Sequence, residues 1–183
     1  MPNVADAPNE IPTPRLRLRK PRLDDAQPIF SAYTSDATVV RFLTWRAHET
    51  EKQTRDFLRH ALDEWANGSG FPYVIEITDG DSGPVGMIHP RARAHEMQFG
   101  YVLARPYWGK GYMTEALEAV VAWSLSRPAT WRASAFCDVD NIASARVMEN
   151  AGLTFEGILR RYFIHPNVSS EPRDCKVYSK VRT

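Results

Sequence analysis

The chain has 183 residues, with 23 Lys and Arg against 22 Asp and Glu, so its formal net charge is only +1. This balance argues against a nucleic-acid surface built on bulk positive potential. The sequence shows no apolar run of the roughly 18 residues that a membrane span needs, and no signal-peptide core near Met1. We therefore expect one soluble, cytoplasmic domain without a membrane partner.

The first residues carry turn formers and little periodicity. Residues 1–14 contain four prolines and are expected to form a disordered tail, followed by a single domain over residues 15–183. The strict alternation from Arg15 to Arg19 predicts a strand with one buried face and its arginines in solvent.

Two helices are expected next. The first covers residues 24–33 with Asp24 as its cap. The second follows Thr50, which forms a capping box with Gln53, and ends at Gly68.

The remaining elements alternate between strands and helices. Three strands are predicted over residues 71–78, 85–89 and 96–103, with turns at 80–83 and 90–93. A buried helix over residues 114–126 and a strand over 131–137 should follow. The next helix starts at Asp140 or Asn141 and ends by residue 151, before Gly152. Two final strands, over 153–157 and 175–181, are separated by a polar loop at 162–173.

Cysteines and histidines indicate neither a disulfide framework nor a metal site. Cys137 and Cys175 are too few for such a framework and are expected to be free thiols. The five histidines lack ligand spacing; His89 and His95, for example, are six residues apart across a predicted hairpin. We expect them on the surface and predict no metal cofactor.

The most distinctive segment is the turn Trp108-Gly109-Lys110-Gly111-Tyr112, which joins a strand-like run to an apolar helical run. Two glycines at such a junction let the backbone bend until several N–H groups face one point. The helix dipole adds partial positive charge there, and Lys110 adds a full one. The pattern favours a phosphate or pyrophosphate ligand, although an ordinary tight turn fits the two glycines about equally well.

Spacing separates this turn from two other phosphate-binding turns. Lys110 lies between the glycines, whereas a P-loop places its lysine after the last glycine. Thr114 stands where a dinucleotide fingerprint has its third glycine, and residues 129–131 offer no acid to hold a ribose. The sequence therefore predicts neither of these folds.

Two separated segments resemble one known family. The run W-G-K-G-Y-M-T-E-A from Trp108 resembles the coenzyme A pyrophosphate loop of the GNAT N-acetyltransferases, and especially of the RimJ/RimL-like ribosomal-protein N-terminal acetyltransferases. Residues 141–153 and 156–160 resemble a downstream block of the same branch, and the likeness extends over about residues 15–181. Trp108 and Met113 depart from the general pattern, which has Gln or Arg and a small residue at these places.

The resemblance implies the fold. It is an α/β (α+β) arrangement with a mixed, mostly antiparallel sheet of about seven strands, flanked by helices and splayed in the middle for coenzyme A. The predicted element order, β-α-α-β-β-β-α-β-α-β-β, agrees with this arrangement.

The resemblance also implies a set of coenzyme-binding residues. The strand before the turn would lie along the pantetheine arm, and Asn141 would hold the pantetheine amides. Ser144 would lie near the coenzyme sulfur and protonate the departing thiolate, although both side chains also fit as helix caps. The expected set is Tyr101, Val102, Leu103, Trp108, Gly109, Lys110, Gly111, Tyr112, Met113, Thr114, Asn141 and Ser144.

The base that would deprotonate the acceptor is less well defined. Many relatives carry a glutamate where this chain has Gln98, which cannot accept a proton at neutral pH. Glu96 shares a strand face with Gln98 and is a candidate catalytic base acting through a water, although a solvated hairpin carboxylate describes it better. Glu115 is expected to complement the helix dipole.

Together these features predict an acetyl-CoA-dependent N-acetyltransferase in which a primary amine attacks the thioester directly. The acceptor would be a protein N-terminus or a small-molecule α-amine, bound between the two N-terminal helices and the loop at residues 162–173, in a monomer or homodimer. A catalytically weak acyl-CoA-binding or regulatory module is the alternative, motivated by Gln98 and Met113. A nucleotide- or phosphoprotein-binding domain is a third candidate, against which the downstream block counts.

Overall fold

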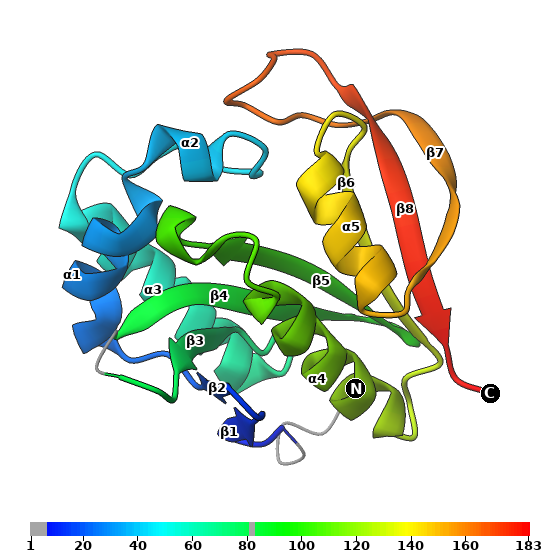
Figure 1. Ribbon diagram of the computed structural model, residues 1–183, viewed down its shortest axis with the longest axis horizontal. Coiled ribbons are helices and arrows are strands. Elements are labelled where there is room, and N and C mark those ends of the chain that lie inside the picture. The colour runs from blue at the N-terminus through cyan, green and yellow to red at the C-terminus, as the bar shows by residue number, and fades with distance from the viewer. Residues whose placement is uncertain (1–6, 81–82) are drawn as a thin grey trace.

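The computed structural model describes residues 7–80 and 83–183, which form one eight-stranded sheet (Figure 1). The strand order is β1-β2-β3-β4-β5-β6-β8-β7, in which β5 and β6 pair in parallel and the other neighbours are antiparallel. The predicted mixed sheet is confirmed, with one strand more than expected. The strands are β1 (Glu10–Pro12), β2 (Leu16–Arg19), β3 (Tyr73–Ile77), β4 (Pro84–Arg93), β5 (Glu96–Leu103), β6 (Arg132–Asp138), β7 (Thr154–Phe163) and β8 (Arg173–Val181).

Helices cover both faces of this sheet. In Figure 1, α4 and α5 lie in front of it, whereas α1 and α3 lie behind it. The helical elements are η2 (Leu23–Asp25), α1 (Ala26–Ile29), the π-helical turn η3 (Phe30–Thr34), α2 (Ala37–Val40), α3 (Glu51–Asn67), η4 (Arg105–Tyr107), α4 (Tyr112–Ser126) and α5 (Ile142–Asn150).

Helix starts follow local hydrogen bonding. As predicted, α3 begins at Thr50, whose N–H donates to Gln53 Oε1 at 3.1 Å. The first helical region differs from the prediction, because Asp25 and not Asp24 accepts the N–H of Arg22, at 2.7 Å. The aspartate that faces Arg22 is set by the turn geometry, which the sequence pattern does not reveal.

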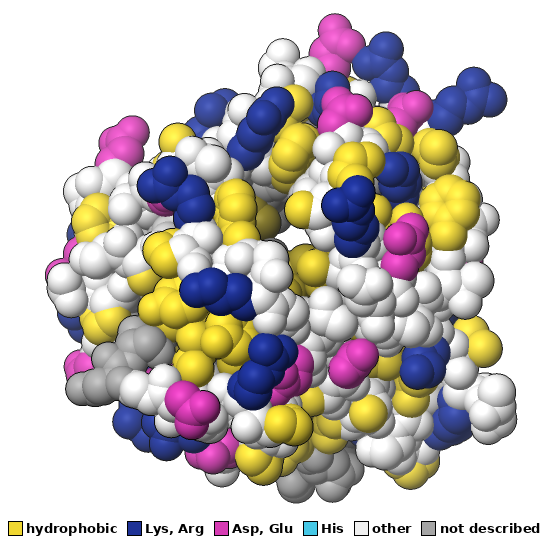
Figure 2. Space-filling view, in the orientation of Figure 1, with side chains coloured by type: hydrophobic (Ala, Val, Ile, Leu, Met, Phe, Trp, Pro, Cys, Tyr) yellow, Lys and Arg dark blue, Asp and Glu magenta, His cyan; other side chains and the backbone are white. Residues whose placement is uncertain are grey.

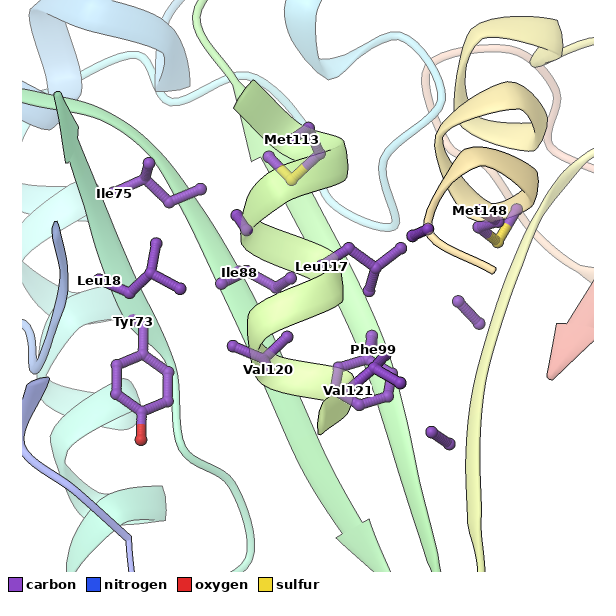
Figure 3. Packing of buried hydrophobic residues seen from close by; sticks show 14 of the residues in the cluster. Leu18, Tyr73, Ile75, Ile88, Phe99, Met113, Leu117, Val120, Val121 and Met148 are labelled. Atoms are coloured by element: carbon purple, nitrogen blue, oxygen red, sulfur yellow. The ribbon is translucent and has the colours of Figure 1, made fainter. Parts of the chain in front are cut away.

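Helix α4 packs its apolar side chains against the sheet. Figure 3 shows Met113, Leu117, Val120 and Val121 pointing from α4 toward strand residues such as Ile88. All five are at most 5% exposed. Burial of each such side chain contributes about 1.5–3 kcal/mol, so this face fixes the helix and the turn before it.

The N-terminal segment differs from the expected disordered tail. Residues 10–12 form β1, which pairs with β2 from Glu10–Arg19 to Pro12–Arg17. Ile11 packs against the core, and the Tyr73 hydroxyl donates to the Pro8 carbonyl at 2.9 Å. These contacts outweigh the turn preference of the prolines; residues 1–6 of the predicted tail lie outside the described part of the chain.

Arg19 is also placed differently from its prediction. The alternating pattern put it in solvent, but it is 6% exposed. Its guanidinium lies 2.6 Å from Asp25 Oδ1, and its Nε donates to Glu76 Oε1 at 2.8 Å. A buried cation is tolerated because these carboxylates pair with it.

The predicted turn at residues 90–93 is part of a strand. β4 continues to Arg93, and the chain reverses at Ala94 and His95. Pro90 fits within β4 because its backbone nitrogen and carbonyl point away from β5. On that far side, the Pro90 carbonyl accepts the N–H of Phe71 at 2.8 Å. Its missing N–H therefore breaks no rung of the β4–β5 ladder.

β5 and β6 separate at their carboxyl ends. They pair with each other from Glu96–Arg132 to Phe99–Ala135. Beyond that point β5 continues to Leu103 and β6 to Asp138, but the two strands no longer pair with each other. Each strand keeps a regular register with its outer neighbour, β5 with β4 up to Leu103 and β6 with β8 up to Asp138, so the sheet opens only between β5 and β6. This opening is the expected splay, and it lies between the turn before α4 and the start of α5 (Figure 1).

Candidate functional site

The turn before α4 presents backbone N–H groups that no side chain covers. Gly109 and Gly111 have φ of 72° and 79°, in the left-handed region that favours glycine. Gly111 is the N-cap of α4, and no side chain caps this helix end. The first amides of a helix, here from Tyr112 to Thr114, have no acceptor within the helix. An anion at this point would accept their hydrogen bonds and complement the helix dipole.

Two cations flank the turn. Lys110 is exposed, with its Nζ 5.6 Å from the centre of the Tyr107 ring. The guanidinium of Arg15 lies 4.7 Å from the centre of the Tyr112 ring, and its Nη1 donates to the Lys110 carbonyl at 3.0 Å. The sequence did not single out Arg15, because nothing local indicates a contact with a residue 95 positions away.

Glu115 holds Arg15 at the turn. Its carboxylate accepts the Arg15 Nε–H at 2.6 Å and the Thr13 hydroxyl at 2.6 Å. Burial raises the pKa of Glu115, but the bonds from Thr13 and Arg15 outweigh that effect and lower it. Glu115 is thus a charged anchor for the residues before β2, in addition to its expected place in the first turn of α4.

The two residues that depart from the general family pattern have different surroundings. Met113 points into the core (Figure 3), so its size does not obstruct the turn. Trp108 is 46% exposed, and its indole Nε1 donates to the Leu103 carbonyl at 2.6 Å. The indole therefore ties the turn to the end of β5.

Backbone groups along the open edge of β5 alternate in direction. The Ala104 N–H donates to the carbonyl of Val85 in β4 at 2.8 Å. By this alternation the Val102 amide also faces β4, whereas those of Tyr101 and Leu103 face the opening. Of the three strand residues expected along the coenzyme arm, Tyr101 and Leu103 are therefore the two whose amides are directed toward the opening. The sequence indicated the strand but not which neighbour each peptide would face.

On the other side of the opening, α5 presents Asn141 and Ser144. Asn141 Oδ1 accepts the Ser144 N–H at 3.1 Å, so Asn141 is the N-cap of α5. Ser144 Oγ lies 2.7 Å from the Tyr101 hydroxyl, which reaches across from β5. Burial raises the pKa of Tyr101 well above its usual value, so the phenol stays protonated. Only this long-range contact identifies the Tyr101 side chain as a candidate site residue.

Cys137 lies next to this pair at the end of β6. Its Sγ is 3.7 Å from the Asn141 carbonyl oxygen. Burial raises the pKa of the Cys137 thiol to about 11, despite a hydrogen bond with Ser144 that lowers it. The thiol is therefore protonated at neutral pH and is a poor nucleophile.

Glu96 has structural partners. Its Oε1 accepts hydrogen bonds from Arg132 Nε at 3.0 Å and from Ser134 Oγ. Arg132 also donates to Glu156, at 2.7 Å. Glu96 pairs at the closed end of the β5–β6 ladder, before the strands separate, so it is not placed to act as the base that its strand face suggested. Gln98 lies nearer the opening and is half-buried.

Two histidines differ from the predicted surface positions. His89 and His165 are 6% and 2% exposed. Burial lowers the pKa of His89, against the opposing effect of Glu64, whose Oε2 lies 2.6 Å from Nε2.

Within residues 7–80 and 83–183, no group of His, Cys, Asp and Glu is arranged to hold a metal ion. Over the same residues, no helix has the length and apolar character to cross a membrane.

Aromatic side chains gather at α3, one of the helices expected to line the acceptor cleft. The Trp45 ring lies 4.9 Å from His48 and 6.4 Å from Phe57 of α3, measured between ring centroids. We call these three residues the aromatic cluster. In the same orientation as Figure 1, Figure 2 shows the surface hollowed between the segment that precedes α4 and helix α5.

Comparison with known proteins agrees with this geometry. Residues 15–154 match the family model described as an acetyltransferase (GNAT) domain. An uncharacterized N-acetyltransferase of Bacillus subtilis (strain 168), YoaA, is 29% identical over 94% of this chain and 96% of its own length.

Solved structures share the fold. The microcin C7 self-immunity acetyltransferase MccE, solved with acetyl-CoA and AMP, superposes with a TM-score of 0.85 at 22% identity, covering 98% of this chain and 99% of its own. RimL, a ribosomal-protein α-N-acetyltransferase solved with coenzyme A, gives 0.83 at 20% identity, covering 94% and 98%. The family model covers most of the sequence, and the chain therefore belongs to the GNAT acetyltransferase family.

Proposed function

We propose that this protein transfers the acetyl group of acetyl-CoA to the α-amine of a protein N-terminus or of a small molecule. One observation carries the proposal: the uncapped turn at Gly109 and Gly111 is tied by Trp108 to the end of β5, where β5 no longer pairs with β6. An anion site at the mouth of a strand opening suits a ligand with a pyrophosphate and a long extended arm.

Different residues would bind different parts of the coenzyme. Amides from Gly109 to Thr114 would hold the pyrophosphate, with Lys110 and Arg15 supplying charge. The Tyr101 and Leu103 amides, which face the opening, would bond the pantetheine arm, and the free Nδ2 of Asn141 would meet it from α5. An N–H directed at the thioester carbonyl stabilises the developing oxyanion, which is worth about 2.7–4 kcal/mol in other enzymes.

Transfer would proceed by direct attack. The amine nitrogen forms a bond to the acetyl carbon, the carbon–sulfur bond breaks, and the amine loses a proton while the thiolate gains one. The high pKa of Cys137, about 11, argues against an acetyl-cysteine intermediate. Ser144 would deliver the proton to the thiolate. The Tyr101 hydroxyl, 2.7 Å from Ser144 Oγ, can then return a proton to Ser144.

The acceptor preference follows from the cost of a neutral amine. An α-amino group titrates at about 7.7–8.0 and a lysine side chain at about 10.4, so neutrality at pH 7 costs about 1.2 or about 4.6 kcal/mol. Gln98 cannot take a proton, and Glu96 is bound to Arg132. A site without a residue that takes the proton of the amine favours α-amines. This is the preference expected of a cytoplasmic RimJ/RimL-like enzyme.

Release of free coenzyme A from acetyl-CoA, screened against α-amines, N-terminal peptides, lysine derivatives and polyamines, tests this function. An active enzyme releases thiol only when an amine is present. Binding of acetyl-CoA without release across the whole panel would favour the alternative, an acyl-CoA-binding or regulatory module.

A further inference from the structure

Asn167 joins two parts of the chain that are distant in sequence. Its Nδ2 donates to the carbonyls of Val40, at 2.8 Å, and Trp45, at 2.7 Å. Val40 ends α2, whereas Asn167 lies in the loop 164–172 between β7 and β8, which reaches toward α2 in Figure 1. In the part of the chain that the structure describes, these are the hydrogen bonds that link the two segments.

Two ion pairs extend this contact into a closed ring around the open end of β5 and β6. On one side Asp36, the N-cap of α2, lies 3.4 Å from Arg105, just past β5. On the other side Arg173 Nη2 lies 2.6 Å from Asp140 Oδ2, just past β6. The ring runs from β5 through α2, across Asn167, and back to β6.

Asn167 is the joint of this ring that depends on one neutral side chain. The other two joints are ion pairs between charged side chains, Asp36 with Arg105 and Asp140 with Arg173. Because both bonds of Asn167 end on backbone carbonyls, they also fix the path of residues 40–45. They hold the backbone of Trp45, which belongs to the aromatic cluster.

A closed ring restricts how a ligand passes through it to reach the opening. A chain cannot be laid sideways into a ring and has to enter end first, so the width of the entering group is limited. The limit on width applies to the atoms next to the reacting amine, because these atoms pass through the ring together with the amine.

We propose that Asn167 determines acceptor specificity by closing this ring, which admits primary amines with slender neighbouring groups and excludes broad ones. This role rests on the acetyl transfer proposed above. Asn167 acts as a positioning residue, through the loop 164–172 and the segment that it binds. The acceptor class is therefore an amine carried on a narrow chain end or on a small molecule.

Two substitutions of Asn167 open the ring in different ways. Asn167→Asp sets a carboxylate against two carbonyl oxygens, and Asn167→Ala removes the donors. Asn150→Asp, at the exposed end of α5, is the matched control with the same change of charge. Coenzyme release would be measured with glycinamide and with tryptophanamide, which present the same amine beside a slender and a broad group.

We expect the ratio of kcat/KM for tryptophanamide over glycinamide to rise about tenfold in both Asn167 variants, the scale of losing two neutral hydrogen bonds. The ratio should be unchanged in Asn150→Asp, and acetyl-CoA affinity by calorimetry should be unchanged in all variants. If Asn167→Asp does not fold, Asn167→Ala carries the test.

An unchanged ratio in folded variants would overturn the proposal. Loss of both activities with an intact circular dichroism spectrum would also overturn it, because the loop would then build the site and not limit entry. A wild-type protein that turns over neither these amines nor any other in the panel would refute the acetyl transfer itself, which is a separate and recognisable result.

Discussion

Replacing Gly111 with alanine should weaken acetyl-CoA binding through the shape of the turn. Gly111 has φ of 79°, which costs other residues about 1–2 kcal/mol. Because Gly111 is exposed, the turn of the alanine variant can leave the positive-φ conformation while no acetyl-CoA is bound. The variant then has to return to that conformation when it binds acetyl-CoA. A cost of 1–2 kcal/mol corresponds to about a five- to thirtyfold higher Kd.

A steric contribution acts in the same direction. A Cβ on Gly111 would lie 3.3 Å from Arg15 Nη2. That guanidinium cannot move freely, because Glu115 binds its Nε and the Lys110 carbonyl binds its Nη1. The larger Gly111→Val should therefore abolish measurable binding.

The control is Gly152→Ala, at the end of α5. Gly152 has φ of 77°, and its added Cβ would meet only the flexible end of Lys180, at 3.5 Å. Gly152→Ala should lower thermal stability and leave the affinity for acetyl-CoA unchanged in calorimetry, whereas Gly111→Ala should lose affinity. An unchanged Kd in Gly111→Ala and Gly111→Val would refute the assignment of this turn.

Three other outcomes are expected. Ser144→Ala should lower kcat by about 10²–10⁴-fold with a smaller effect on KM, and Tyr101→Phe should share part of that loss; a change confined to KM would make Ser144 a binding residue. Activity with an α-amine should rise with pH until the amine titrates near 8, and a separate lower pKa in the kcat profile would reveal an enzyme base that this account lacks. Burial raises the pKa of Asp138, but its bond to Arg173 outweighs this and lowers it, so its stabilisation is present above the unfolded pKa of about 3.9 and is lost as pH falls further. Asp138→Asn should cost about 1.5–3 kcal/mol in urea unfolding at pH 7, with a gap to wild type that shrinks below pH 4; a gap independent of pH would contradict the ion pair.

Local patterns predicted the elements that frame the site. The helical spacing after Thr50 and the apolar run after Thr114 predicted α3 and α4, because both helices bury a face that the sequence displays directly. The two glycines before α4 likewise predicted the turn, since a positive φ at such positions restricts the residue type.

The contacts that complete the site join distant segments and were not predictable in this way. Arg15 reaches Lys110, and Asn167 reaches Trp45, through folds of the chain that no local spacing encodes. Glu96 illustrates the same limit: its strand face was predicted, but its pairing with Arg132 depends on the parallel register of β5 and β6.

The most direct test uses one peptide that carries a free α-amine and one internal lysine. After incubation with the protein and acetyl-CoA at pH 7, tandem mass spectrometry locates the acetyl group. We predict acetylation of the α-amine, with release of one coenzyme A for each acetyl group transferred. Acetylation mainly at the lysine, or bound acetyl-CoA without transfer to this peptide or to any small α-amine, would contradict the account.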